Sequence, residues 1–381
     1  DVMSQPAVLF GGPSPEHDVS ILTGLQATRA LSTGSRVTAI YWSKAGDFFE
    51  VDSGLEAEDF VDGVPKGSDQ LRLVVGAARD GGFVPARTGR LRRDAPVDID
   101  TVLNCCHGGP GEDGTIQAAL DLAGLRYTGP TAAGAALGMD KLAFGAAAAA
   151  VGLPTLPRWL LDPVTNAEAS QPRPHAQPGP YIVKPRFGGS SIGIEVVQDW
   201  DTATALVKSG IHFRRGAVVE PYRPASYDLN IAVRTWPELQ LSAIERPLRS
   251  KGEGDILGYK DKYLGGEGLV SAARELPAQI PDTLEKDLRD AAASVAAMAL
   301  ARGVARIDFL IDGNDWFVNE INTVPGSLAK YLWVKPHAVP FGTLLSDMVD
   351  ESHERSTVRY DSSGADGVAL RSAGSIASKL A

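Results

Sequence analysis

The sequence predicts a multidomain protein that combines α/β and α+β architecture. Its 381 residues exceed what one hydrophobic core usually serves, so two or three domains are expected. A short apolar run at residues 7–10, a glycine-rich turn, an apolar helical stripe and a second strand at 36–42 predict an N-terminal βαβ unit. From about residue 223 the pattern consists mainly of strands with one long helix, which is typical of an α+β domain.

Composition narrows the possible classes of protein. The net charge of −10 disfavours nucleic acid as a partner, because that binding depends on neutralising phosphates. The only two cysteines, Cys105 and Cys106, are adjacent on an apolar run, which favours buried free thiols and gives no sign of secretion. No stretch is long enough to span a membrane, and no leader is evident. A cytoplasmic enzyme without a membrane partner is therefore expected.

The element pattern divides the chain into three predicted domains and a tail. Residues 1–137 form an α/β substrate domain, with a strand at 97–106, a helix at 115–123 and short irregular pieces at 44–95. The remaining elements are expected as follows: a central domain at 138–222 with a helix at 140–151, a surface connection at 162–180 and strands at 181–185, 192–197 and 217–220; a third domain at 223–351 with strands at 229–234, 239–245, 305–311 and 316–321, a loop at 248–272 and helices at 283–302 and 341–351; and a loosely held tail at 352–381.

Two predicted strands near the end of the third domain carry polar side chains in a pattern that suits a metal. The period of a strand places Arg306 and Asp308 on one face, and likewise Glu320 and Asn322. Apolar neighbours such as Ile307 indicate that both strands are buried, where an unpaired carboxylate is costly. Carboxylate and amide oxygens are the ligands of Mg²⁺, which takes further ligands from phosphates and water. We therefore predict a Mg²⁺ site formed by Asp308, Glu320 and Asn322.

A glycine-serine turn follows Lys184 between two predicted strands. Backbone N–H groups in such a turn, at 188–193, can face phosphate oxygens, with the lysine as a point charge. The turn is not a P-loop, because the lysine precedes the glycines and no helix follows. Further along the chain, Glu220 ends the strand predicted at 217–220 and is a candidate partner for an adenine amino group or a ribose hydroxyl.

These motifs together resemble the ATP-grasp fold, and the N-terminal ones resemble D-alanine–D-alanine ligases. The opening GGPSPEHDVS at 11–20 is similar to the start of that family, and HG followed by GEDGTIQ at 107–117 is similar to its second loop. The segments YTG at 127–129 and MDK at 139–141 follow in family order. The resemblance covers roughly residues 5–345. It implies a three-domain ATP-grasp architecture in which two α+β domains clamp ATP.

The resemblance also implies roles for individual residues. Glu16 would bind the ammonium of the first amino acid, oriented through Ser190 and Tyr263, and Arg306 with the Gly326 N–H would stabilise an oxyanion. Lys262 and Tyr263 would belong to a mobile lid at 259–263. The remaining roles are ATP binding for Lys141, Lys184, Ser191, Glu220, Asp228 (if one residue is inserted) and Lys262, and substrate binding for His107, Ser327, Tyr331 and Leu332.

The function implied is an ATP-dependent ligase that joins two amino acids through an acyl-phosphate. Its cofactors would be ATP and Mg²⁺, with two ions that Mn²⁺ can replace, and a homodimer is usual for the family. Tyrosine at position 263 accompanies amine acceptors in the family, so an amide is expected. Three alternatives stay open: a ligase of a specialised pathway for a non-alanine substrate, a nucleotide-binding regulator that lost ligation, and a kinase-like or carboxylase-type ATP-grasp enzyme.

The chain departs from the family after the metal ligands. Direct alignment puts Tyr331 where the family has a small serine that holds the second carboxylate, with Lys330 and Trp333 beside it. A bulky residue in a pocket built for alanine predicts a different second substrate, and Lys330 favours an acceptor with extra negative charge. Alternatively, Ser327 and Leu328 perform this role after a short deletion. Both interpretations are compatible with the sequence.

Overall fold

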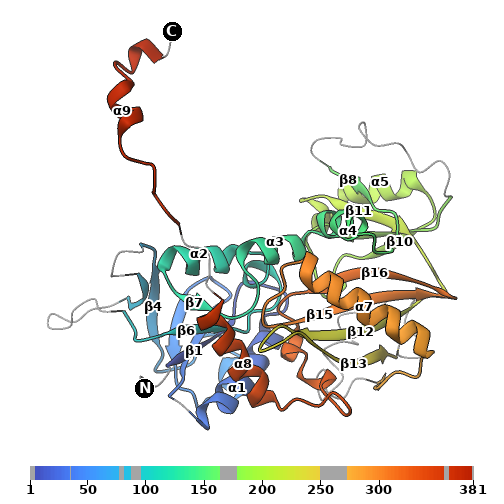
Figure 1. The fold of residues 1–381 in the computed structure, drawn as a ribbon, viewed down its shortest axis with the longest axis horizontal. Helices are drawn as coiled ribbons and strands as arrows, with labels where there is room; N and C mark the ends of the chain where they lie inside the picture. The colour runs from blue at the N-terminus through green and yellow to red at the C-terminus, as the bar shows by residue number, and fades with distance from the viewer. Residues whose placement is uncertain are drawn as a thin grey trace.

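Three β-sheets organise the chain. The computed structural model describes residues 5–34, 36–76, 81–86, 96–163, 178–248, 273–355 and 360–379. Across these ranges the strands form sheets of seven, four and five strands, in chain order. The seven-stranded sheet lies at one end of the molecule and the other two lie together at the opposite end (Figure 1). This arrangement confirms the mixed α/β and α+β class.

The seven-stranded sheet contains the predicted βαβ unit. Strands β2, β1, β6 and β7 are parallel neighbours, while β3, β4 and β5 continue the sheet as antiparallel hairpins. Apolar side chains of α1 cover one face and those of α2 the other. The elements are β1 Pro6–Gly11, α1 His17–Ser32, β2 Thr38–Trp42, β3 Phe48–Val51, η1 Ala57–Phe60, β4 Asp69–Val74, β5 Gly82–Pro85, β6 Thr101–Asn104, η2 Gly109–Gly111, α2 Thr115–Ala123 and β7 Arg126–Tyr127.

Two expectations for this region need correction. The segment 44–95 is more regular than expected, because its short apolar pieces pair as β3, β4 and β5. The strand expected at 97–106 is shorter at both ends and covers only Thr101–Asn104. The Asn104 side chain accepts from the Cys106 N–H at 2.9 Å and donates to the Gly111 carbonyl at 3.0 Å, which turns the chain out of the sheet. Cys105 and Cys106 are buried free thiols, as predicted.

The four-stranded antiparallel sheet runs in the order β10-β9-β11-β8 and packs against α5. The strand expected at 192–197 is confined to its last three residues, because Ser190 and Ser191 have φ of 53° and 59° and keep the preceding segment in a turn. The elements of this part of the chain are α3 Ala132–Met139, α4 Lys141–Ala150, β8 Trp159–Leu161, β9 Tyr181–Pro185, β10 Glu195–Val197, α5 Trp200–Ser209, η4 Ile211–Phe213 and β11 Ala217–Pro221.

The five-stranded antiparallel sheet runs in the order β14-β13-β12-β15-β16, with α7 and the Phe144 side chain of α4 packed on it. Its register aligns polar residues of four strands in one row: Glu245 opposite Asn230, Asn230 opposite Asp308, and Asp308 opposite Glu320. Its elements are β12 Tyr227–Arg234, β13 Gln240–Pro247, β14 Arg274–Glu275, α7 Asp282–Met298, β15 Val304–Asp312, β16 Asp315–Asn322 and η6 Gly326–Leu332.

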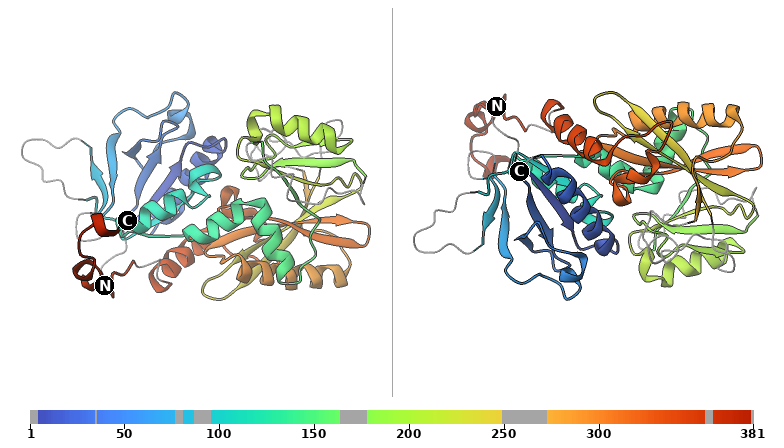
Figure 2. Two further views of the ribbon diagram at one scale, coloured as in Figure 1. Left: turned by 90° about the horizontal axis from the view of Figure 1, so that it is seen from above. Right: turned by 90° about the horizontal axis from the view of Figure 1, so that it is seen from below.

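The chain then returns to the first sheet. Helix α8, Phe341–Glu354, packs with α1 on one face of the seven-stranded sheet (Figures 1 and 2). It extends beyond the predicted end at residue 351 because the buried Ser352 hydroxyl bonds to the Thr101 hydroxyl at 2.8 Å, so the first residues assigned to the tail are part of the packed core. Residues 360–379 carry α9, Val368–Ser372, and η7, Ala377–Lys379, and extend away from the body. No helix in the described ranges has the length and apolar character needed to cross a membrane.

Candidate active site

A cleft lies between the four-stranded and five-stranded sheets. It extends to Glu16 in the first lobe, the part of the chain built around the seven-stranded sheet. Residues from all three sheets and their loops contribute to its wall. The residues predicted from the sequence that line it are Glu16, Lys141, Lys184, Ser190, Ser191, Glu220, Asp228, Arg306, Asp308, Glu320, Asn322, Gly326 and Tyr331.

Lys184 and Glu220 form a buried ion pair in the cleft. Lys184 Nζ donates to Glu220 Oε2 at 2.6 Å and to Asn319 Oδ1 at 3.3 Å. Adjacent antiparallel strands, β9 and β11, carry the two side chains. Burial opposes ionisation of Glu220, but Lys184 and Arg158 outweigh it and hold the pKa of the carboxyl below its usual value. A carboxylate kept charged at this depth is suited to accept hydrogen bonds from a nucleotide.

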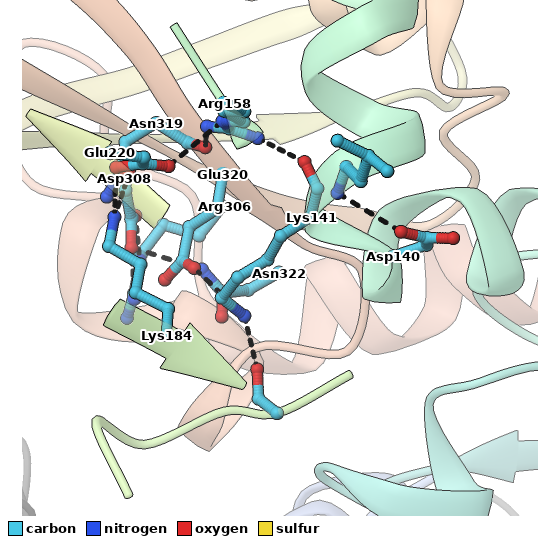
Figure 3. A network of polar contacts seen from close by, with 12 residues as sticks. Asp140, Lys141, Arg158, Lys184, Glu220, Arg306, Asp308, Asn319, Glu320 and Asn322 are labelled. Carbon is cyan, nitrogen blue, oxygen red and sulfur yellow. Dashed lines mark hydrogen bonds and ion pairs between the residues drawn. The ribbon is translucent and has the colours of Figure 1, made fainter. Parts of the chain in front are cut away.

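Arg158, just before β8, is a site residue that the sequence gave no signal to find. Its Nε lies 3.0 Å from Glu220 Oε1, and its terminal nitrogens donate to the main-chain carbonyls of Lys141 and Asn319 (Figure 3). The side chain is only 6% exposed. Arg158 therefore joins three segments of the site: the strand end at Glu220, the start of α4 and the strand β16.

Lys141 begins α4 and reaches back into the cleft. Asp140 caps the helix by accepting from Leu142 and Ala143, and also pairs with Arg186 at 2.6 Å, which fixes the position of Lys141. Lys141 Nζ donates to the Gly188 carbonyl and lies 3.7 Å from Glu320. Burial lowers the pKa of Lys141. The lysine thus links the glycine-serine turn to the strand of the predicted metal ligands.

Asp308, Glu320 and Asn322 converge as the sequence predicted, because Asp308 lies opposite Glu320 in the register of β15 and β16. Arg306 binds Asp308 with two contacts of 2.7 Å, and Asn322 donates to Asp308 at 3.1 Å. Among the described residues no three His, Cys, Asp or Glu side chains group as a metal site. Two carboxylates and an amide oxygen with Lys141 nearby nevertheless fit Mg²⁺, which completes its shell with water and phosphate oxygens.

The first lobe contributes Glu16 to the cleft. Ser190 Oγ donates to Glu16 Oε1 at 2.5 Å, which places the glycine-serine turn directly against the N-terminal loop. A Cβ at Gly108 would lie 2.4 Å from Glu16 Oε2, and its φ is 64°, so only glycine allows this approach. Ser190 and Ser191 both adopt left-handed backbone conformations. Such conformations cluster at functional sites, where surrounding structure holds them.

Glu112 is a second carboxylate beside Glu16, and its role was not predicted. Its oxygens accept from the N–H groups of Gly108 and Val324, both at 2.9 Å, so the side chain joins the first lobe to the loop after β16. Burial, and then the nearby charge of Glu16, raises the pKa of Glu112 to about 7. The sequence placed Glu112 in a family-like loop but gave no indication of this link to Val324.

Tyr331 also lines the cleft. Arg306 donates to the Tyr331 hydroxyl at 3.2 Å, and both side chains line the cleft. Lys330, expected nearby, instead donates to Gln26 at 2.7 Å outside the cleft, and Trp333 is buried in the core below α1. Three consecutive left-handed residues, 327–329, rotate the chain between Gly326 and these side chains.

Three predicted substrate-binding residues lie behind the cleft wall. The buried His107 ring contacts the Val324 carbonyl at 2.7 Å and the Thr23 hydroxyl at 2.8 Å, and the Ser327 N–H donates to Thr23 at 3.1 Å. Leu332 is fully buried in the core. Their side chains support the loop after β16 and do not line the cleft. Lys262 and Tyr263, with the expected lid, lie outside the described residues.

Comparison with known families matches most of the chain. Residues 5–130 match the family described as D-ala D-ala ligase N-terminus, and residues 149–350 match D-ala D-ala ligase C-terminus. A D-alanine–D-alanine ligase of Rhodococcus opacus is 31% identical over 375 residues, covering 93% of this chain and 99% of the relative. D-alanine–D-alanine ligase B of Bradyrhizobium diazoefficiens is 29% identical over 363 residues, covering 93% of both chains.

Solved structures share the fold. A D-alanine–D-alanine ligase from Coxiella burnetii superposes with a TM-score of 0.75 at 22% identity, covering 93% of this chain and 95% of that one. The VanG D-Ala:D-Ser ligase from Enterococcus faecalis gives the same TM-score and identity, covering 92% and 99%. At this level of identity, the likeness concerns the three-domain ATP-grasp architecture.

Proposed function

The chain belongs to the D-alanine–D-alanine ligase family, and we propose that it joins two amino acids in an ATP-dependent, amide-forming reaction at the cleft between its second and third sheets. The observation that carries this proposal is the gathering of Glu16, Arg306 and Asp308, from distant parts of the chain, on one cleft. The relatives named above act on D-alanine, and D-alanine is the first substrate proposed here.

The first step activates a carboxylate. The ammonium of the first amino acid binds Glu16, which Ser190 orients through the 2.5 Å hydrogen bond. A carboxylate oxygen of that amino acid attacks the γ-phosphorus of ATP, the bond to ADP breaks, and an acyl-phosphate forms. Lys141 and Lys184 neutralise phosphate charge during this transfer, which depends on placement and charge more than on a covalent protein group.

The second step forms the amide. The neutral amine of the second amino acid attacks the acyl carbon, the bond from that carbon to the phosphate oxygen breaks, and the proton lost by the amine leaves with the phosphate. Negative charge develops on the acyl oxygen in the tetrahedral intermediate, and the guanidinium of Arg306 with the N–H of Gly326 would stabilise it; both residues line the cleft. Asp308 holds Arg306 in place through two hydrogen bonds of 2.7 Å.

Asp308, Glu320 and Asn322 are the residues that would hold Mg²⁺. The ion would supply charge neutralisation on the phosphate oxygens when bound. Two ions, with Mn²⁺ as a substitute, are the stoichiometry proposed. Glu220 and Asp228 would hold the adenosine, supported by their place in the cleft wall and by the charged state of Glu220.

The acceptor is the part of the proposal in which this chain departs from its relatives. Tyr331 lines the cleft beside Arg306, whereas Ser327 lies behind its wall. This arrangement supports the direct alignment, in which a tyrosine replaces a small serine. We propose that the acceptor differs from D-alanine in size or in the position of its carboxylate.

Two further parts of the proposal concern the cellular location of the protein and its oligomeric state. A cytoplasmic location is supported by two buried thiols that are not bridged, as expected in a reducing compartment. A homodimer is proposed from the family resemblance alone, and sedimentation of the purified chain tests it.

The experiment that tests the function is ATP-dependent phosphate release, screened over pairs of D- and L-amino acids with Mg²⁺ present. Release that requires two amino acids, with a product whose mass equals their sum less one water, supports the proposal. Fragmentation of the product distinguishes an amide from an ester, and an ester as the main product contradicts the role proposed for Tyr263. Phosphate release that needs no second substrate contradicts ligation.

A further inference from the structure

Two residues at the edge of the five-stranded sheet lie near Tyr331, in the part of the cleft proposed to hold the acceptor. Arg274 begins β14 and Glu245 lies on β13, and both line the cleft. Arg274 Nη1 donates to Glu245 Oε2 at 2.9 Å. Their side chains are 12% and 6% exposed, respectively. This is a buried ion pair inside the site, and none of the functions above accounts for it.

Arg274 also contacts Tyr331. The central carbon of its guanidinium lies 4.4 Å from the centre of the tyrosine ring, within the range of a cation–π interaction. The hydroxyl of the same tyrosine accepts from Arg306 at 3.2 Å. The Tyr331 side chain is therefore held at two points, its face by Arg274 and its hydroxyl by Arg306.

Glu245 connects this pair to the centre of the sheet. Asn230 donates to Glu245 Oε1 at 3.3 Å, and Asn230 lies between Glu245 and Asp308 in the register of the three strands. Asp308 in turn binds Arg306. The contacts link Glu245, Arg274, Tyr331, Arg306 and Asp308 one after another, and Asn230, which bonds to Glu245, lies opposite Asp308 in the sheet.

We propose that Arg274, held by Glu245, is a positioning and specificity residue that fixes the Tyr331 ring as the wall of the acceptor site and keeps its hydroxyl on Arg306. This inference rests on the proposed ligase function and deepens it. An ion pair that leaves Arg274 charged but immobile suits this role, because a planar guanidinium keeps its stacking geometry when one edge is bound. Without it, Tyr331 is free to rotate, and both the acceptor space and the orientation of Arg306 change.

Arg274→Ala tests the proposal, and Arg246→Ala is the matched control. Arg246 is on the same hairpin and stacks at 4.0 Å over a different ring, that of Tyr227. Initial rates are measured over a grid of ATP and amino-acid concentrations, with separate Michaelis constants for the two amino-acid sites. For Arg274→Ala we expect the acceptor KM to rise about tenfold, while the KM for ATP changes by less than about twofold. Arg246→Ala should change none of them by more than about twofold.

A double-mutant cycle distinguishes action through Tyr331 from general damage. In a Tyr331→Ala background, Arg274→Ala should have little further effect on the acceptor KM, because the ring that it positions is gone. Glu245→Gln, which keeps the side-chain volume, should shift the acceptor KM in the same direction by a smaller factor. Retained ATP affinity by calorimetry shows that each variant is folded, and Arg274→Lys replaces Arg274→Ala if the latter is not.

Two results overturn the inference. The first is an acceptor KM for Arg274→Ala no more changed than that of Arg246→Ala. The second is a double variant whose effect equals the product of the single effects, which would mean that Arg274 and Tyr331 act independently. Absence of ligation by the unmodified protein with every amino-acid pair contradicts the proposed function instead, so the two failures are distinguishable.

Discussion

The guanidinium of Arg158 lies 3.0 Å from the carboxylate of Glu220, and both side chains are almost fully buried. The same guanidinium binds the main-chain carbonyls of Lys141 and Asn319. A single side chain thus fixes the distance between a proposed adenosine ligand, a proposed phosphate ligand and the strand of the metal site. Removal of one partner from a buried pair leaves an uncompensated charge, so the geometry at Glu220 depends on Arg158.

Arg158→Ala is expected to raise the KM for ATP by roughly 10–100-fold, with a smaller effect on the amino-acid constants. Nucleotide affinity measured by calorimetry and steady-state kinetics checks this. Arg302→Ala is the control. Arg302 is also buried and binds main-chain carbonyls, but it lies between β7 and α8 and not in the cleft. Equal loss of ATP affinity in both variants would mean that the effect is one of general stability.

Asp308→Asn and Glu320→Gln are expected to abolish turnover while the fold is retained, because each removes a charged ligand proposed for Mg²⁺. Titration of Mg²⁺ during phosphate release should show a strongly increased requirement or no activity. Asp315→Asn, an exposed change at the start of β16, the strand that carries Glu320, should behave as the unmodified protein. Near-normal turnover of either cleft variant at saturating Mg²⁺ would remove that residue from the metal site.

Tyr331→Ser is expected to shift acceptor preference toward D-alanine. The substitution restores the small residue of the family and opens the space that the tyrosine ring occupies beside Arg306. A pocket discriminates between substrates by only roughly 1–3 kcal/mol per methylene. The unmodified protein should therefore still use D-alanine, but as a poor acceptor. Ratios of kcat/KM for D-alanine and larger amino acids, measured for both proteins, check this. If D-alanine is already the best acceptor and the substitution changes nothing, Tyr331 does not set the specificity.

Glu112 should make the protein less stable as pH rises from about 4.5 to about 7. Its pKa is raised from 4.5 to about 7 by burial and by Glu16, so the folded state favours the protonated form. Stability from this group is fully present below about pH 4.5 and lost as pH rises through about 7. The difference in unfolding free energy between the unmodified protein and Glu112→Gln should therefore fall across this window and then level off.

Urea unfolding at several pH values between about 5 and 8 measures that difference. Glu58→Gln, at an exposed position, serves as the control and should show no such trend. A difference that is constant or increases with pH would contradict the raised pKa of Glu112.

Local patterns in the sequence predicted many elements and much of the cleft wall. β9 and α2 have the bounds predicted from their apolar periodicity and flanking residues, and the register of β15 and β16 brings Asp308 opposite Glu320 as expected. The contributions of Arg158 and Arg274 were not predictable, because each depends on pairing between strands that are distant in the sequence.

Lys330 illustrates the same limit. Alignment with the family suggested that it lies beside the acceptor pocket, but the left-handed turn at 327–329 directs it to Gln26 instead. Non-glycine residues adopt this conformation rarely, and no residue of Ser327-Leu328-Ala329 favours it intrinsically. The surrounding contacts, including the bond from the Ser327 N–H to Thr23, hold it in place.

The core beneath the seven-stranded sheet combines the two ends of the folded body: Val8 and Phe10 of β1 pack in one cluster with Leu345, Met348 and Val349 of α8. On the ribosome, the first strands and α1 therefore emerge long before the helix that completes their core. Until then an apolar face of the nascent lobe lacks its cover, and such faces bind chaperones or aggregate. Emergence of α8 from the ribosome, rather than local folding of the first lobe, becomes the event that closes this core. Loss of the last turns of α8 should consequently affect the solubility of the newly made chain more strongly than its position, far from the cleft, would suggest.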